Sequence, residues 1–274
     1  MVTRNLRIDR TDFSYIDEGD GRPVVFVHGG MSDNRCWDVH RPNFTSRYRL
    51  IAPTMRYYGL SPWPDDGRNF SIQVHANDLA AFISALKLDP VALVGWSYGA
   101  AVILVMAAQH PQLVERIFLY EHGLATFVAD PAAAARAADD RLQALNAAKL
   151  AASGGDLDGA VRLAMDGVDD REGAFRDLPD QMRAVMLENG RILSLFFASP
   201  PPPSVTCADL ARLTFPACIV VGEDSRVFYR IAAEAAHRCI PGSQLIKVPN
   251  ARHLWPSRDP AAFSQLILDF LDKG

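Results

Sequence analysis

Residues 91–108 read VALVGWSYGAAVILVMAA and contain no charged residue. The stretch is long enough to cross a bilayer, but Gly95 and Gly99 interrupt it and a proline stands near each end. Glycine and proline at such places indicate two short elements joined by a sharp turn. We therefore expect a buried strand over Val91–Val94 and a buried helix over Tyr98–Gln109.

Short β-rich runs alternate with helical runs on both sides of this stretch. Alternation of this kind is typical of a mostly parallel sheet with helices on both faces, and the runs add up to eight strands. The other expected strands are Arg4–Asp9, Phe13–Asp17, Val24–Val27, Arg49–Ala52, Val114–Tyr120, Ala217–Val221 and Gln244–Val248. The flanking helices are expected within Asp33–Phe44, from Ser71 to Leu86, and over Phe228–Arg238 and Pro260–Leu271.

The alternation stops between Gly123 and Leu213, where no convincing strand is found. Ala-rich Pro131–Ala152 favours a helix because alanine has the highest helix propensity. A second helix is expected over Gln181–Phe197. At 274 residues the chain is long for one domain and short for two. We therefore expect one core, residues 1–122 and 214–274, and a helical cap at residues 123–213.

The composition of the chain limits the kinds of binding partner that we expect. The net charge is −4 and no basic tract is present, so we expect no nucleic acid. The N-terminus has no apolar signal segment, so no membrane partner is expected. No paired metal-ligand spacing occurs, and no metal is expected. The four scattered cysteines predict reduced, mostly buried thiols and a cytoplasmic protein; they are Cys36, Cys207, Cys218 and Cys239.

The turn inside residues 91–108 carries the motif Gly95-Trp-Ser97-Tyr-Gly99. Gly-x-Ser-x-Gly between a strand and a helix is the setting of a nucleophile elbow, which exposes the serine on a strained turn. A serine hydroxyl is a weak nucleophile and needs a base. Of the seven histidines, His253 follows the last expected strand, and that loop reaches the carboxyl edge of the sheet where Ser97 also emerges.

Three segments together resemble the α/β-hydrolase superfamily, in its serine-nucleophile branch with a helical cap. They are His28-Gly-Gly30 after a strand, the Ser97 motif, and the late Asn250-Ala-Arg-His253. The resemblance covers nearly the whole chain. It implies an oxyanion hole formed by backbone N–H groups of Gly29, Gly30 and Tyr98, and it implies no cofactor.

The acid that orients the histidine has two candidates. In most members of the superfamily an aspartate stands three residues beyond a glycine after the seventh strand. That position here is Ser225, and Asp224 lies one residue too early. Glu121 instead ends the sixth strand, 24 positions after Ser97, in a placement similar to that of the zearalenone lactone hydrolase. We prefer Glu121 and keep Asp224 as the alternative.

Aromatic residues gather in the loops and in the cap, which favours a largely apolar pocket. The expected pocket residues are Trp37, Tyr57, Trp63, Trp96, His122, Phe127, Phe196, Phe197 and Trp255. We expect a small, apolar ester or lactone as substrate, cleaved through an acyl-serine. A carbon–carbon bond hydrolase or lyase, and a non-catalytic binding protein, stay open because the fold hosts all of these. A homodimer is also left open.

Overall fold

The computed structural model describes residues 3–9 and 11–273. Its eight strands form one sheet in the order β1-β2-β4-β3-β5-β6-β7-β8. The first three strands of this order pair antiparallel and the others pair parallel, which confirms the expected sheet. The strands are β1 (Thr3–Ile8), β2 (Thr11–Glu18), β3 (Arg22–Val27), β4 (Tyr48–Pro53), β5 (Val91–Trp96), β6 (Val114–Tyr120), β7 (Ala217–Gly222) and β8 (Gln244–Val248).

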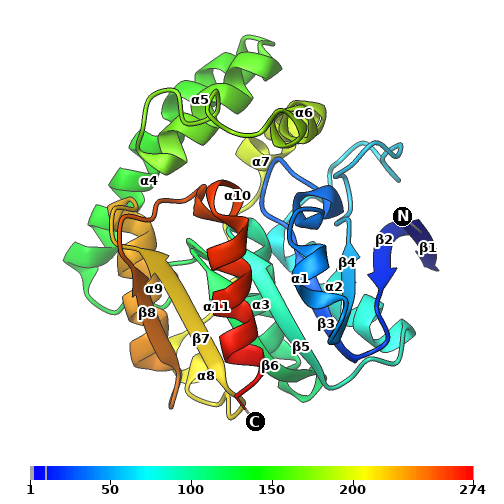
Figure 1. Cartoon of the computed structure of the whole chain (residues 1–274). Helices are drawn as coiled ribbons and strands as arrows, with labels where there is room; N and C mark the ends of the chain where they lie inside the picture. The colour runs from blue at the N-terminus through cyan, green and yellow to red at the C-terminus, as the bar shows by residue number, and fades with distance from the viewer. Residues whose placement is uncertain (1–2, 10, 274) are drawn as a thin grey trace.

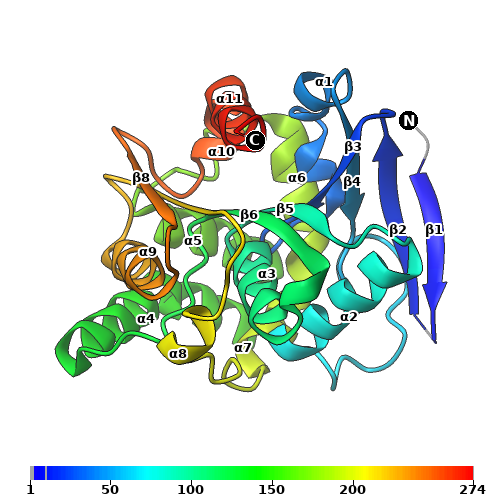
Figure 2. The same ribbon diagram turned by 90° about the horizontal axis from the view of Figure 1, so that it is seen from below.

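Helices cover both faces of the sheet. Figure 2 shows α1, α10 and α11 on one side, and α2, α3 and α9 on the other. These helices are α1 (Arg41–Phe44), α2 (Ile72–Ala85), α3 (Tyr98–Gln109), α9 (Val227–Cys239), α10 (Trp255–Arg258) and α11 (Pro260–Leu271). Two short 3-10 helices complete this part of the chain: η1 (Asn34–Trp37) precedes α1, and η2 (Pro111–Leu113) follows α3.

The uncharged stretch forms the centre of the molecule. Every residue of β5 is buried, and so are residues 98–107 of α3. A strand and a helix that are enclosed on all sides have no face in contact with solvent. This explains why polar residues do not recur along the stretch with the period of a strand or a helix. Within the described part of the chain, no helix is both long and apolar enough to span a membrane.

The chain between β6 and β7 is helical, and Figure 1 shows most of it above the carboxyl ends of the parallel strands. We call residues 123–213 the helical insertion. Its elements are α4 (Pro131–Ser153), α5 (Leu157–Asp169), α6 (Asp180–Glu188), η3 (Asn189–Ile192), α7 (Leu193–Ala198) and α8 (Cys207–Leu210). Helix α5 was not predicted from the sequence, because its Asp- and Gly-rich composition is not typical of a helix. The Asp156 side chain caps its N-terminus.

The single helix expected over Gln181–Phe197 is wrong. The chain breaks there into α6, η3 and α7. The break falls at Asn189, which is fully buried, and its side chain accepts a hydrogen bond from the Gly59 N–H at 2.7 Å and donates one to Asp33 at 2.8 Å. These tertiary hydrogen bonds replace the regular turn of a continuous helix.

The expectation of four reduced thiols is also wrong. Cys207 in α8 and Cys239 at the end of α9 form a disulfide, with their Cα atoms 5.0 Å apart. The insertion returns to the core at α8 and packs against α9, which brings together two residues 32 positions apart. Cys36 and Cys218 are free and buried, as expected.

Candidate active site

Ser97 stands on a strained turn between β5 and α3. Its backbone has φ 56° and ψ −119°, a combination that non-glycine residues rarely adopt. The turn is tight: a Cβ atom at Gly95 would lie 2.7 Å from the Ala100 Cα, and one at Gly99 would lie 2.4 Å from the His28 carbonyl oxygen. Both glycines are therefore required for the close approach that presents the serine.

His253 is held by Glu121. Its Nδ1 lies 2.7 Å from a carboxylate oxygen of Glu121, and both side chains are buried. Glu121 directly follows β6 and has a positive φ of 52°. Its second oxygen accepts a hydrogen bond from the Gly222 N–H at 2.9 Å and another from the Ser225 hydroxyl. Three donors thus compensate the burial of this carboxylate.

Asp224, the alternative acid, is exposed, and only its backbone takes part in the nearby contacts. Its N–H donates to the Ala251 carbonyl, and its carbonyl accepts from Arg252. Ser225 occupies the position where relatives were expected to carry an aspartate, and it donates its hydroxyl to Glu121. This contact joins residues 104 positions apart, and no sequence motif indicates it.

The residues expected to form an oxyanion hole lie beside Ser97. A Cβ atom at Gly29 would lie 3.5 Å from the Ser97 Cβ, and one at Gly30 would lie 3.7 Å from the Tyr98 Cβ. The His28 side chain braces this loop, since its Nδ1 contacts the Gly29 carbonyl at 2.8 Å and its Nε2 accepts from the Met55 N–H at 3.0 Å. Burial lowers the pKa of His28 to about 4, so the imidazole is neutral at pH 7.

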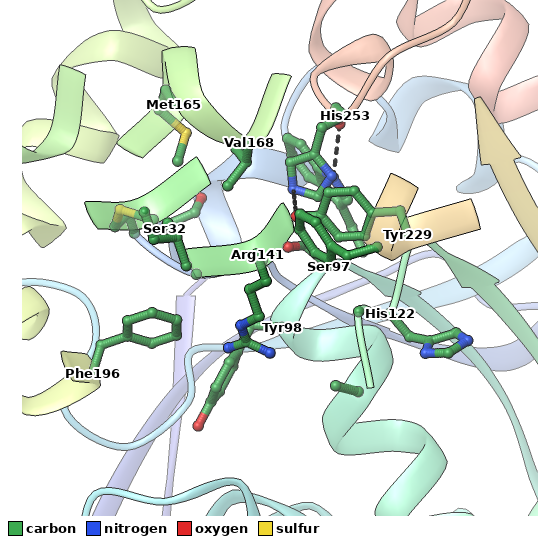
Figure 3. A pocket seen from close by; sticks show the side chains of 18 of the residues that line it. Ser32, Ser97, Tyr98, His122, Arg141, Met165, Val168, Phe196, Tyr229 and His253 are labelled. Carbon is green, nitrogen blue, oxygen red and sulfur yellow. Dashed lines mark hydrogen bonds between the residues drawn. The ribbon is translucent and has the colours of Figure 1, made fainter. Parts of the chain in front are cut away.

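Tyr229, from α9, is a site residue that the sequence reading missed. Its ring stacks on the imidazole of His253, with centroids 4.4 Å apart and an interplanar angle of 8°. Its hydroxyl lies 3.2 Å from the His253 Nε2 and also interacts with the Ser97 side chain. Figure 3 shows Tyr229 beside both residues. A tyrosine in the first turn of a surface helix carries no motif that would predict this role.

A second missed residue fixes the His253 loop from the helical insertion. Asp169, the last residue of α5, is fully buried. One carboxylate oxygen accepts from the Leu254 N–H at 2.8 Å, and the other accepts from Arg258 at 2.7 Å. The insertion therefore contacts the residue next to His253 directly.

A cavity opens above Ser97, with about 790 Å³ of free space that includes its mouth. Of the nine expected pocket residues, Trp96, His122 and Phe196 line it. The other six lie outside the lining and pack elsewhere, for example Trp37 against the core ring of Phe26. The six are Trp37, Tyr57, Trp63, Phe127, Phe197 and Trp255. All six belong to the hydrophobic core or pack against it, which residue type alone could not reveal.

His122 is a buried polar residue of the cavity wall. Burial lowers its pKa to about 4. Its Nδ1 accepts from the Leu124 N–H at 3.1 Å, so the ring proton is on Nε2, which is buried without a hydrogen-bond partner. No group of three or more His, Cys, Asp or Glu residues within 3–9 and 11–273 could hold a metal ion.

Comparison with known proteins agrees with this fold. The family described as "Alpha/beta hydrolase family" matches residues 24–266, and the chain therefore belongs to that family. The protein is therefore a hydrolase of the α/β type.

Two curated relatives and one solved structure illustrate the range of this family. The 2-(acetamidomethylene)succinate hydrolase of Mesorhizobium japonicum is 25% identical over 99% of this chain and 96% of its own. The 2-hydroxy-6-oxo-2,4-heptadienoate hydrolase of Pseudomonas putida is 37% identical over 38% of each chain. A thermophilic esterase from Thermogutta terrifontis superimposes with a TM-score of 0.71 at 22% identity, over 100% of this chain and 99% of its own.

Proposed function

We propose that the protein hydrolyses a carboxylic ester or lactone through an acyl-serine intermediate. Ser97 is the nucleophile, His253 the base, and Glu121 the acid that orients it. The observation that carries this proposal is the 2.7 Å contact between Glu121 and the His253 Nδ1, at the same sheet edge as the strained Ser97 turn. A carboxylate on Nδ1 fixes the proton there and leaves the Nε2 lone pair to act as base.

The proposed reaction has two stages, acylation of Ser97 and hydrolysis of the acyl-serine. In the first, Nε2 takes the Ser97 hydroxyl proton as Oγ attacks the carbonyl carbon, and the Gly30 and Tyr98 N–H groups stabilise the oxyanion. The imidazolium then returns the proton to the leaving alkoxide, and the acyl-serine forms. In the second stage water attacks the acyl carbon and gives a proton to Nε2. The imidazolium passes that proton to the Ser97 Oγ as the acyl–oxygen bond breaks, which releases the carboxylic acid and restores the enzyme.

We also propose that residues 123–213 act as a cap over the core formed by 1–122 and 214–274. The support is their position above the strand ends and the contribution of Arg141, Met165 and Phe196 to the cavity wall. A cap of this kind selects substrates by shape and excludes water. A small apolar substrate agrees with a wall made mostly of apolar side chains. The homodimer and the cytoplasmic location stay predictions, although a disulfide is uncommon in a reducing compartment.

A carbon–carbon bond hydrolase is the second candidate. The name of the Pseudomonas putida relative describes an oxo acid without an ester bond, so its hydrolysis must break a different bond. The same serine, base and acid would serve either reaction, and the substrate determines which bond breaks. A retained fold that only binds a ligand is the non-catalytic alternative.

Turnover of 4-nitrophenyl esters of graded chain length tests the proposal. We expect hydrolysis by the native protein, and we expect Ser97→Ala to lose activity by a factor on the order of a million, the loss seen when the serine of a protease is removed. Ester turnover that survives in Ser97→Ala would refute the assignment. Hydrolysis of a vinylogous diketone without any ester hydrolysis would favour the second candidate.

A further inference from the structure

The described lining of the cavity contains one arginine and no lysine, aspartate or glutamate. Arg141 projects from α4, and the remaining lining residues described are apolar or uncharged. Figure 3 shows its guanidinium inside the cavity, close to the ring of Tyr98. Arg141 as a whole is exposed to solvent, so its charge needs no acidic partner for the fold to be stable.

No described acidic side chain pairs with Arg141. The two carboxylates that precede Arg141 on α4 are engaged elsewhere: Asp140 binds Arg226 at 2.7 Å and the Phe228 N–H at 3.0 Å, and Asp139 accepts from Gln143 at 2.9 Å. No hydrogen bond or ion pair joins Arg141 to another residue within 3–9 and 11–273. Its guanidinium is therefore available to an anion that enters the cavity.

The electrostatic field of Arg141 reaches the reacting groups. Burial raises the pKa of Tyr98 and of Tyr229, and in both cases the positive charge of Arg141 opposes that rise. Tyr229 contacts His253, and Tyr98 follows Ser97 directly. A ligand anion held by Arg141 would therefore lie within the same cavity as the reacting carbonyl group.

From these observations we propose that Arg141 binds a carboxylate of the substrate. The substrate is then an ester or lactone with an apolar body and a separate carboxylate group. A guanidinium pairs with a carboxylate through two parallel hydrogen bonds. A single positive charge in the wall matches a monoanion better than a phosphate, which requires more compensating charge. This inference rests on the proposed function, because it names the substrate class of the same site.

Binding to the inactive Ser97→Ala protein tests the inference without requiring turnover. The probes are monomethyl suberate, which has one carboxylate, and dimethyl suberate, its neutral counterpart, measured by isothermal titration calorimetry. We expect the monoanion to bind more tightly, and we expect adding Arg141→Gln to weaken it about tenfold while the diester is unaffected. The preference should also fall as salt is added.

Arg136→Gln is the matched control, since Arg136 is an exposed arginine of the same helix that does not line the cavity. It should leave both affinities unchanged. Equal affinities of the two probes for Ser97→Ala, or equal weakening of both by Arg141→Gln, would overturn the inference. A general fall in affinity caused equally by Arg136→Gln would overturn it as well.

An activity measurement separates this inference from the proposed function. Mono-4-nitrophenyl suberate and its methyl ester are compared as substrates of the native protein and of Arg141→Gln. Hydrolysis of both esters with the same kcat/KM in both proteins would contradict the carboxylate preference and leave the esterase proposal standing. Selective binding of the monoanion without hydrolysis of either ester would support the Arg141 site and contradict the esterase proposal.

Discussion

At the scale of single residues, the environment of the His253 Nε2 decides the chemistry. Glu121 takes the Nδ1 side, so Nε2 is the nitrogen available to Ser97. The Tyr229 hydroxyl lies 3.2 Å from the same nitrogen. Because Nε2 has one lone pair, the phenol engages the acceptor that the Ser97 hydroxyl needs in the proposed reaction. In this arrangement Tyr229 restrains the base, while its stacked ring holds the imidazole in place.

Tyr229→Phe tests this restraint. The variant keeps the stacked ring and removes only the hydroxyl, so Nε2 is left to Ser97. We expect a fluorophosphonate to label Ser97 about two- to tenfold faster, the range given by the net free energy of one hydrogen bond. Stopped labelling with mass spectrometry gives the rate.

Tyr98→Phe is the control, because the Tyr98 hydroxyl bonds to the His75 Nδ1 at 2.8 Å and not to His253. It should change the labelling rate little. Slower labelling of Tyr229→Phe would mean that the phenol helps to transfer the proton instead of competing for the base.

At the scale of elements, the helical insertion is tied to the loops that carry the site. Asp169 at the end of α5 binds the loop after His253, and Asp140 in α4 binds the start of α9, just before Tyr229. Both contacts use buried or half-buried carboxylates. A movement of α4 or α5 would therefore displace the residues around the base as well as the roof of the cavity.

Asp169→Asn should show this coupling. The amide keeps the shape but loses the charge that pairs with Arg258 at 2.7 Å. We expect the free energy of unfolding to fall by about 1.5–3 kcal/mol. We also expect kcat to fall more than KM rises, because the loop holding His253 loses an anchor.

Urea unfolding and steady-state kinetics on the folded protein measure the two effects. The neighbouring Asp170→Asn is the control, since the Asp170 side chain is more than half exposed and pairs with Arg226 at 2.8 Å. It should have little effect on either quantity. An unchanged kcat in Asp169→Asn would show that the contact serves stability alone.

At the scale of the whole molecule, several buried histidines make stability depend on pH. Burial lowers the pKa of His28, His40 and His122 to about 4, and that of His75 to about 3. In the unfolded chain these groups titrate near 6.5. Between pH 6.5 and 4 the unfolded state therefore binds more protons than the folded state, and stability must fall as the pH falls.

Chemical unfolding from pH 7.5 to pH 4.5 measures this dependence. Each neutral histidine contributes a slope of up to about 1.4 kcal/mol per pH unit below its unfolded pKa. We expect little change above pH 7 and a steep loss below pH 6. The free energy of unfolding would have to stay constant down to pH 5 to contradict this account.

The sequence predicted the sheet well and the surroundings of the site poorly. The bounds of α3, β6, β8 and α11 agree with expectation, because each is a continuous apolar or amphipathic run between clear breaks. The elbow and the base followed from a motif and from strand order. The contact of Ser225 with Glu121 and the break at Asn189 depend on residues that are distant in the sequence. No local pattern encodes such contacts.

We propose that Glu121 orients His253 and that His253 activates Ser97. The most direct test is fluorophosphonate labelling with peptide mapping of the native protein, Glu121→Gln and Asp224→Asn, each checked for folding. The account predicts fast labelling of Ser97 in the native protein and in Asp224→Asn, and a loss of about four orders of magnitude in Glu121→Gln, as in a serine protease whose acid is replaced by its amide. Labelling abolished in Asp224→Asn and retained in Glu121→Gln would contradict it.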